Sequence, residues 1–266
     1  MLKIDHIINP VQVKETSDLF IAQPVTFETM RISRRTCAPE IEVSLLSTQY
    51  PEDRSMIPAD FEAAPDLERS VPDVHNFRVH RKLPLIKDIL DRLYQHGSGD
   101  YLIYTNVDIA LQPYFYQTAA GIIEQGYDAF VINRRTIPAA YKSTREIPLM
   151  YSEIGEKHKG WDCFIFRRDL YPRFDLRSAC IGSGWIGRVL LTNLAALAKK
   201  FHIFTDLHVT FHVGNEQSWK TGILDDYRMF NRSQCREILL TFEQKYGPFD
   251  RRKIPGRFWR KLEPGE

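Results

Sequence analysis

Residues 101–109, YLIYTNVDI, join an apolar run to a polar cluster, and this junction decides the fold. The run YLIYT predicts a short buried strand. Oxygen-bearing side chains follow it, and Asn106 and Asp108 stand two apart. Because ligands of open α/β sheets bind outside the carboxyl ends of the strands, this cluster is the first candidate site.

Segments on either side of this junction alternate between strand and helix patterns. Strands are predicted at IDHII, IEVSLLS, DAFVIN, WDCFIF, FHIF and HVTFHV. Helices are predicted at about 16–35, 81–95, 112–126, 185–200 and 233–247. This alternation favours an α/β fold, a Rossmann-type sandwich with a mostly parallel central sheet flanked by helices. We expect one domain over residues 1–246 and a solvated basic tail over 247–266.

Composition excludes several classes of protein. The 266 residues carry a formal net charge of only +2 and no block of five basic residues, so no nucleic-acid partner is indicated. The four cysteines lack C-x-x-C spacing, so neither a zinc site nor a disulfide framework is predicted. The sequence shows no signal-peptide pattern and no run of eighteen apolar residues, so we expect a cytoplasmic protein without a transmembrane segment.

The chemistry of the polar cluster suits a cation and phosphates. Asp108 offers a hard carboxylate for Mg²⁺ or Mn²⁺, which leave several positions for water and phosphate oxygens. Asn106 can bond a sugar hydroxyl or a water on that metal. The alternative is an Asx turn that caps the helix beginning near Pro113.

The order of these segments resembles a glycosyltransferase of the GT-A fold over roughly residues 4–219. The resemblance rests on the first strand ending in Asn-Pro, on RKLPLI, TNVDI and GWDCFIF, and on the late segment FTDLHVTFHVGNEQSW. It implies a GT-A-like catalytic domain in which a D-x-D motif at a strand end binds a divalent ion and the diphosphate of a nucleotide sugar. Asn106 departs from that pattern because it stands where the first carboxylate would be.

Two histidines lie in the late apolar run. The even spacing of His208 and His212 predicts the same face of one strand. Imidazole can complete a coordination sphere begun by Asp108, and the resemblance gives that role to His212, which Gly214 follows. The alternative is a histidine satisfied by a backbone partner.

Asp162 lies between Trp161 and Cys163 at the start of a predicted strand. Its position resembles the acceptor-side acid of inverting GT-A enzymes, where it would accept the proton of the attacking hydroxyl, and Trp161 would lie on the acceptor side. In a retaining enzyme Asp162 would instead orient the acceptor or the donor sugar. In the structural alternative it bonds nearby backbone.

Further residues are placed to contact the donor. Positive charge stabilises a departing diphosphate, and Arg81, Lys82 and Arg134 lie near predicted element ends. Their alternative is solvated surface. Thr105 belongs to the strand-end cluster, and the Asn9-Pro10 turn is expected to lie against the nucleotide base or to serve as a plain strand terminator.

The segment ACIGSGWIG at 179–187 matches the G-x-G-x-x-G spacing of dinucleotide-binding folds. No strong strand precedes it, and only 79 residues follow Gly187, so an NAD site is not favoured. We interpret the glycines as a tight turn into a helix. Trp185 then becomes a candidate acceptor-side ring for stacking on a sugar, or else a core tryptophan.

The residues together predict a metal-dependent glycosyltransferase that moves a sugar from a nucleotide-diphosphate sugar to an acceptor hydroxyl. Two alternatives stay open. A sugar-phosphate nucleotidyltransferase is less favoured because HIINPVQVKET lacks the usual glycine-rich loop. A catalytically silent nucleotide- or sugar-binding module gains weight from Asn106.

Overall fold

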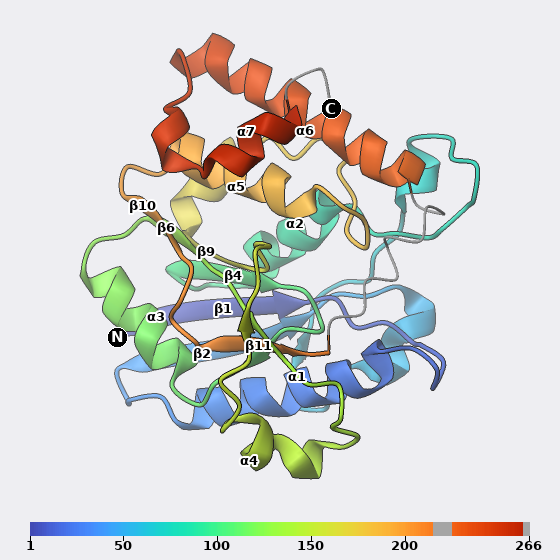
Figure 1. Cartoon of the computed structure of the whole chain (residues 1–266), viewed down its shortest axis with the longest axis vertical. Coiled ribbons are helices and arrows are strands. Elements are labelled where there is room, and N and C mark those ends of the chain that lie inside the picture. The colour runs from blue at the N-terminus through green and yellow to red at the C-terminus, as the bar shows by residue number, and fades with distance from the viewer. Residues whose placement is uncertain (215–224, 263–266) are drawn as a thin grey trace.

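A seven-stranded sheet forms the centre of the chain in the computed structural model, which describes residues 1–214 and 225–262 (Figure 1). Its strand order is β10-β6-β9-β4-β1-β2-β3. The strands are β1 (Leu2–Ile8), β2 (Ile41–Ser47), β3 (Glu62–Ala63), β4 (Tyr101–Thr105), β6 (Ala129–Ile132), β9 (Cys163–Arg167) and β10 (Phe201–Phe204). All seven predicted strands are therefore present, and all but HVTFHV contribute to this sheet.

Strand direction gathers the functional segments at one edge. β1 pairs in parallel with β2 and β4, whereas β9 runs antiparallel between β4 and β6. The amino end of β9 consequently lies beside the carboxyl ends of its neighbours, and Cys163 pairs with both Thr105 and Ile132. We call this side of the sheet the carboxyl edge; it brings 106–108, 133–134 and 161–162 together.

Helices cover both faces of the sheet (Figure 1). They are α1 (Leu19–Arg35), α2 (Ile86–His96), α3 (Phe115–Glu124), α4 (Ile147–Met150), α5 (Ile186–Leu197), α6 (Asp225–Tyr246) and α7 (Gly256–Leu262). Alternate residues of β4 divide between the faces: Leu102 and Tyr104 pack with α2 and α5, and Ile103 packs with α1 and α3. Successive side chains of a strand point to opposite faces of the sheet, and helices cover both faces, so the side chains on either face are buried.

A second, four-stranded sheet lies against the carboxyl edge in the order β5-β11-β7-β8. Its strands are β5 (Ala110–Leu111), β7 (Arg135–Ile137), β8 (Glu156–Lys157) and β11 (Thr210–Val213). β5 follows β4 through the TNVDI segment, and β7 follows β6. Two strands of this sheet therefore begin just after two strands of the central sheet end. It thereby carries His212 on β11 back toward Asp108.

The prediction that His208 and His212 share a strand face is wrong. β11 begins at Thr210, and His208 precedes it with a left-handed backbone (φ 51°). Its Nε2 lies 3.0 Å from the carbonyl oxygen of Glu153. The turn breaks the period of two, which leaves His212 as the one histidine of the pair on the strand.

The expectation of a solvated C-terminal tail is also wrong. Ile254, Phe258 and Trp259 are buried in the core cluster that also contains residues of α5 and α6. A 3₁₀ helix over Arg251–Lys253 and α7 therefore return the chain to the domain. Burying two aromatic side chains stabilises this arrangement by several kcal/mol, about 2 to 3 for each ring.

Among the described residues, no helix combines the length and the apolar character needed to cross a bilayer.

Candidate active site

Asp108 and His212 form an ion pair at the carboxyl edge although 104 positions separate them in the chain. His212 Nε2 lies 3.1 Å from Asp108 Oδ2, and His212 Nδ1 donates to the carbonyl oxygen of Gly214 at 2.8 Å. His212 is 2% exposed, whereas the Asp108 side chain is 22% exposed. The Asp108 side chain is therefore partly exposed, and the buried imidazole contacts its Oδ2.

Each partner keeps the other charged. Burial acts to raise the pKa of Asp108, but the hydrogen bond and charge of His212, aided by Arg134, outweigh it, and the pKa lies below its ordinary value. Burial likewise acts to lower the pKa of His212, but Asp108 overcomes it and the pKa is raised. Each group therefore favours the charged form of its partner.

Asp108 and His212 also fit a divalent cation. Asp108 Oδ1 is buried and has no hydrogen-bond partner among the described residues. The bond from His212 Nδ1 to Gly214 fixes the tautomer whose Nε2 lone pair can bind a metal once the proton leaves. No cluster of three or more metal-ligating side chains exists among residues 1–214 and 225–262. A cation here would need oxygens from a substrate or water, which is how Mg²⁺ is commonly held.

The neighbours of Asp108 in the predicted motif take other partners. Asn106 Oδ1 accepts a hydrogen bond from the Tyr104 hydroxyl at 3.0 Å. Thr105 is fully buried, and its hydroxyl lies 2.9 Å from Nε2 of His6 in the core. The side chain of Thr105 thus bonds to the core at the strand end and is not available as a ligand beside Asp108.

Asp162 lies at the same edge and is held by Arg134. Arg134 Nη1 is 3.1 Å from Asp162 Oδ1, and both residues are less than a tenth exposed. His158 Nδ1 lies 3.3 Å from Asp162 Oδ2. That nitrogen accepts the Gly160 N–H at 3.0 Å, so it carries no proton for Asp162 in this arrangement. Asp162 Oδ2 is accordingly buried without a hydrogen-bond donor among the described residues.

The remaining donor-side candidates occupy the other end of the edge. Asn9 donates from Nδ2 to the Thr48 carbonyl at 2.6 Å, and Pro10 beside it is buried. Lys82 is exposed; its Nζ lies 2.5 Å from a Glu52 carboxylate oxygen and 4.0 Å from the centre of the Tyr50 ring. Arg81 is exposed and its backbone N–H donates to the Tyr227 hydroxyl at 2.7 Å. The structure therefore gathers Arg134, Asp162 and Asp108, whereas Arg81 contacts Tyr227 of α6 and Lys82 contacts Glu52 and Tyr50 after β2.

Both tryptophans predicted for the acceptor side lie at the edge. Trp161 precedes Asp162, and Trp185 caps α5 with a left-handed backbone (φ 78°). Such a conformation is strained for a bulky residue and persists only where its surroundings impose it. A Cβ on Gly187 would lie 2.8 Å from the Trp161 carbonyl oxygen, so a glycine there lets α5 approach the Trp161 backbone closely. Gly182, with φ 73°, serves the turn that the sequence predicted, and Gly187 adds a packing role that it did not.

Two arginines near these rings were missed by the sequence analysis. The Arg188 guanidinium carbon lies 4.5 Å from the Trp185 ring centre, and that of Arg257 lies 4.9 Å from the Trp161 ring centre. The i, i+3 spacing of Trp185 and Arg188 on a predicted helix was an available signal. Arg257 was hidden because its segment was assigned to a solvated tail.

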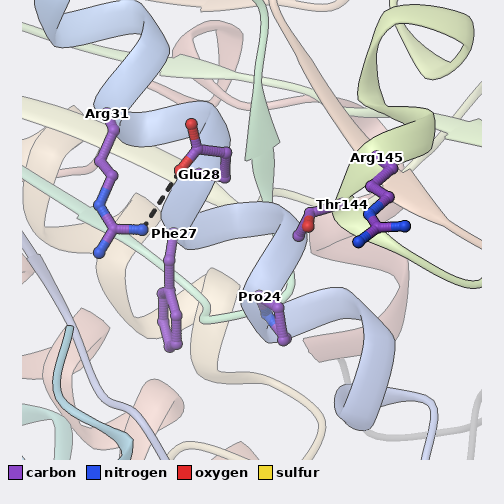
Figure 2. Close-up of a pocket in the computed structure, with 6 residues that line it drawn as sticks. All are labelled: Pro24, Phe27, Glu28, Arg31, Thr144 and Arg145. Carbon is purple, nitrogen blue, oxygen red and sulfur yellow. Dashed lines mark hydrogen bonds and ion pairs between the residues drawn. The ribbon is translucent and has the colours of Figure 1, made fainter.

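A surface cavity of about 380 Å³ lies elsewhere, against α1 (Figure 2). Figure 2 shows Arg31 paired with Glu28 along the helix, with Arg145 across from them. The residues that line this cavity are Pro24, Phe27, Glu28, Arg31, Thr144 and Arg145. None of them was singled out from the sequence, so the buried polar atoms at the carboxyl edge remain the better marker of the site.

No protein-family model matches the sequence, and a search of curated proteins finds no significant match. Solved structures do match over nearly the whole chain. The S. aureus TarS 1–349 structure in complex with UDP is 10% identical with a TM-score of 0.51, covering 98% of this chain and 78% of that one. The chain has a GT-A-like fold. This confirms the mixed α/β sandwich predicted from the sequence.

Two further structures are similar at lower scores. TarS 1–349 in complex with UDP-GlcNAc is 9% identical with a TM-score of 0.49 and covers 98% of this chain and 78% of that chain. M. tuberculosis glucosyl-3-phosphoglycerate synthase in complex with Mg²⁺ and uridine-diphosphate is 13% identical with a TM-score of 0.46 and covers 94% and 81%.

Proposed function

We propose that the protein is a metal-dependent glycosyltransferase that uses a nucleotide-diphosphate sugar. The observation that carries this proposal is the row of groups along one sheet edge: the Asp108–His212 pair, then Arg134 and Asp162, all brought together from distant segments. The fold shared with a UDP complex supports it.

Asp108 and His212 would hold the divalent cation, either Mg²⁺ or Mn²⁺. Held there, the ion would neutralise charge on the departing diphosphate. Arg134 adds a fixed positive charge beside this position. Asn106, already bonded to Tyr104, shapes the strand exit and is not assigned as a ligand.

Asp162 serves the acceptor in this proposal. The acceptor oxygen forms a bond to the anomeric carbon while the bond from that carbon to the diphosphate oxygen breaks. Asp162 Oδ2, which lacks a donor among the described residues, takes the proton released from the acceptor hydroxyl. Arg134 holds Oδ1 and so fixes the direction in which Oδ2 points. This assignment corresponds to an inverting transfer.

A thermal-shift screen tests the donor half of the proposal. We expect UDP and UDP-sugars to raise the melting temperature in the presence of Mn²⁺ or Mg²⁺ and to lose that effect with a chelator, because a ligand of the folded state stabilises it. Asp108→Asn should abolish the metal-dependent part. Asp206→Asn is the matched control, since Asp206 is an exposed carboxylate paired with Arg135 and Lys157. No stabilisation by any nucleoside diphosphate would contradict the proposal.

A silent binding module is the second candidate, and the engagement of Asn106 by Tyr104 favours it, because the first position of the motif then offers no carboxylate. Nucleotide-sugar binding that is equal with and without chelator, together with no product from any acceptor, would establish it in place of the enzyme.

A further inference from the structure

A cationic aromatic cluster extends the carboxyl edge beyond Asp162. The Arg188 guanidinium carbon lies 4.5 Å from the Trp185 ring centre and 5.5 Å from that of Trp161. The Arg257 guanidinium carbon, from α7, lies 4.9 Å from the Trp161 centre. Trp161 therefore contacts two guanidinium groups, one from each of two helices.

The positive charge of this cluster is not balanced within the described residues. Burial lowers the pKa of Arg188, and the charge of Arg257 acts in the same direction. Burial also lowers the pKa of Arg257. Neither arginine forms an ion pair with a carboxylate of residues 1–214 or 225–262, in contrast to Arg69 with Asp88. Desolvated like charges cost free energy unless an anion joins them.

Hydrogen-bond donors in the same neighbourhood also lack acceptors. Arg188 Nε and Trp161 Nε1 are buried without a partner among the described residues, and Trp161 is only 6% exposed. Arg257 donates to the Lys159 carbonyl, which positions it on the segment that leads to Asp162. Ser183, 7% exposed, has an unpartnered hydroxyl on the turn into α5. The unpartnered nitrogens of Trp161 and Arg188 are both donors, and the N-terminal end of α5 adds a positive dipole.

The strain at Trp185 supports a function for this cluster. A left-handed tryptophan costs of order 1–3 kcal/mol, yet it places the ring under Arg188. The Arg188 guanidinium lies over both rings, and its Nε has no partner among the described residues, so this N–H can bond a ligand.

We propose that Arg188, Arg257 and Trp161 form a subsite for a phosphoryl group of the acceptor. A phosphoryl group carries about −1.5 to −2 charge at neutral pH, which complements two guanidinium groups, and its three oxygens accept charge-assisted bonds. Because Trp161 adjoins Asp162, the subsite would hold the acceptor beside the group that takes its proton. The inference deepens the proposed glycosyl transfer and rests on it.

Isothermal titration with inorganic phosphate, at constant ionic strength and with UDP and Mg²⁺ saturating, tests the subsite directly. We expect phosphate to bind the wild type and the Kd to rise at least tenfold in Arg188→Gln and in Arg257→Gln, with the UDP Kd unchanged. Arg260→Gln is the matched control, an exposed arginine on the same helix as Arg257. Arg188→Lys keeps the charge and should recover part of the affinity, which a merely structural role would not predict.

The outcomes separate this inference from the proposed function. Phosphate binding that is the same in Arg188→Gln as in wild type would overturn the subsite, as would loss of phosphate binding on addition of UDP, since the arginines would then serve the donor. If UDP does not bind but phosphate still depends on Arg188, the donor proposal fails and the anion site stands.

A panel of acceptors tests the phosphoryl assignment. With a UDP-sugar donor, glucose 6-phosphate should give a kcat/KM at least tenfold above that of glucose and of glucuronate, and Arg188→Gln should remove the difference through KM. Equal use of glucose, or a preference for the carboxylate, would overturn it.

Discussion

The two halves of the carboxyl edge differ in how their charges are balanced. Around Asp108 each buried charge has a partner supplied by the chain: His212 for Asp108, and Arg134 for Asp162. Around Trp161, Arg188 and Arg257 have none among the described residues. The Asp108 half has its charges paired within the chain, so it can bind a cation together with an anionic substrate. The Trp161 half carries unpaired positive charge, which favours binding of an anion.

The largest expected effect comes from removing Asp162, the proton acceptor, from the half whose charges are paired. Asp162→Asn keeps the shape and its contact with Arg134 but cannot take a proton, so we expect the transfer kcat to fall by about 10²–10⁴-fold. UDP affinity, measured by calorimetry, should stay within twofold. A variant with near-normal kcat would remove Asp162 from the reaction.

The next test breaks the ion pair itself. Asp108→Asn removes the carboxylate while keeping a hydrogen-bond acceptor for His212, and we expect kcat/KM to fall by about 10²–10³-fold. The dependence of the rate on Mn²⁺ or Mg²⁺ concentration should weaken in parallel. Glu156→Gln, on exposed β8, serves as the control and should titrate with metal like the wild type. Unchanged metal dependence in Asp108→Asn would place the cation elsewhere.

A third test separates the pH dependence of folding from that of the paired charges. Burial lowers the pKa of His6 from its ordinary 6.5 to about 3, so the folded chain keeps His6 neutral while the unfolded chain protonates it. Stability from this residue is complete above pH 6.5 and is lost as the pH falls below it, by about 2 kcal/mol at pH 5.

Urea unfolding at pH 7.5 and pH 5 measures this loss. His6→Gln, which can keep one of the bonds to Thr105 or Tyr116, should be less stable at pH 7.5 but should lose less on acidification. An identical loss in wild type and variant would assign the acid sensitivity to other groups.

The smallest expected effect concerns the half around Trp161, where Arg188 and Arg257 lack carboxylate partners among the described residues. Trp185→Ala removes the ring under Arg188, so we expect about a tenfold higher acceptor KM. Because the Trp185 side chain is buried in the core cluster, the melting temperature should fall as well. Initial rates at saturating donor give the KM. A large fall in melting temperature with unchanged KM would make Trp185 a packing residue.

Sequence reasoning found the groups that mark strand ends and missed those that depend on helix docking. TNVDI and WDCFIF combine an apolar run with a polar boundary, and that pattern directly indicates a sheet edge. The pairing of Asp108 with His212 came from the family resemblance, because no local rule connects residues so far apart. His208 was misplaced because a single left-handed residue interrupts an otherwise regular alternation.

The C-terminal segment shows why charge alone misleads. Its basic residues suggested a solvated tail, yet Phe258 and Leu262 stand four apart on α7, and Ile254, four residues before Phe258, is buried with them. Weighing that period against the charge would have predicted α7. The contact of Arg257 with Trp161 depends on how α7 docks on the domain, and no spacing in the sequence encodes it.

The close approach of α5 to Trp161 has a mechanical consequence. With no side chain at Gly187, the helix backbone rests almost directly on the peptide that precedes Asp162. A movement of α5 would therefore move that peptide directly, because no side chain lies between them. An acceptor that shifts Arg188 would also shift α5, so acceptor binding and the position of the Asp162 carboxylate would be coupled.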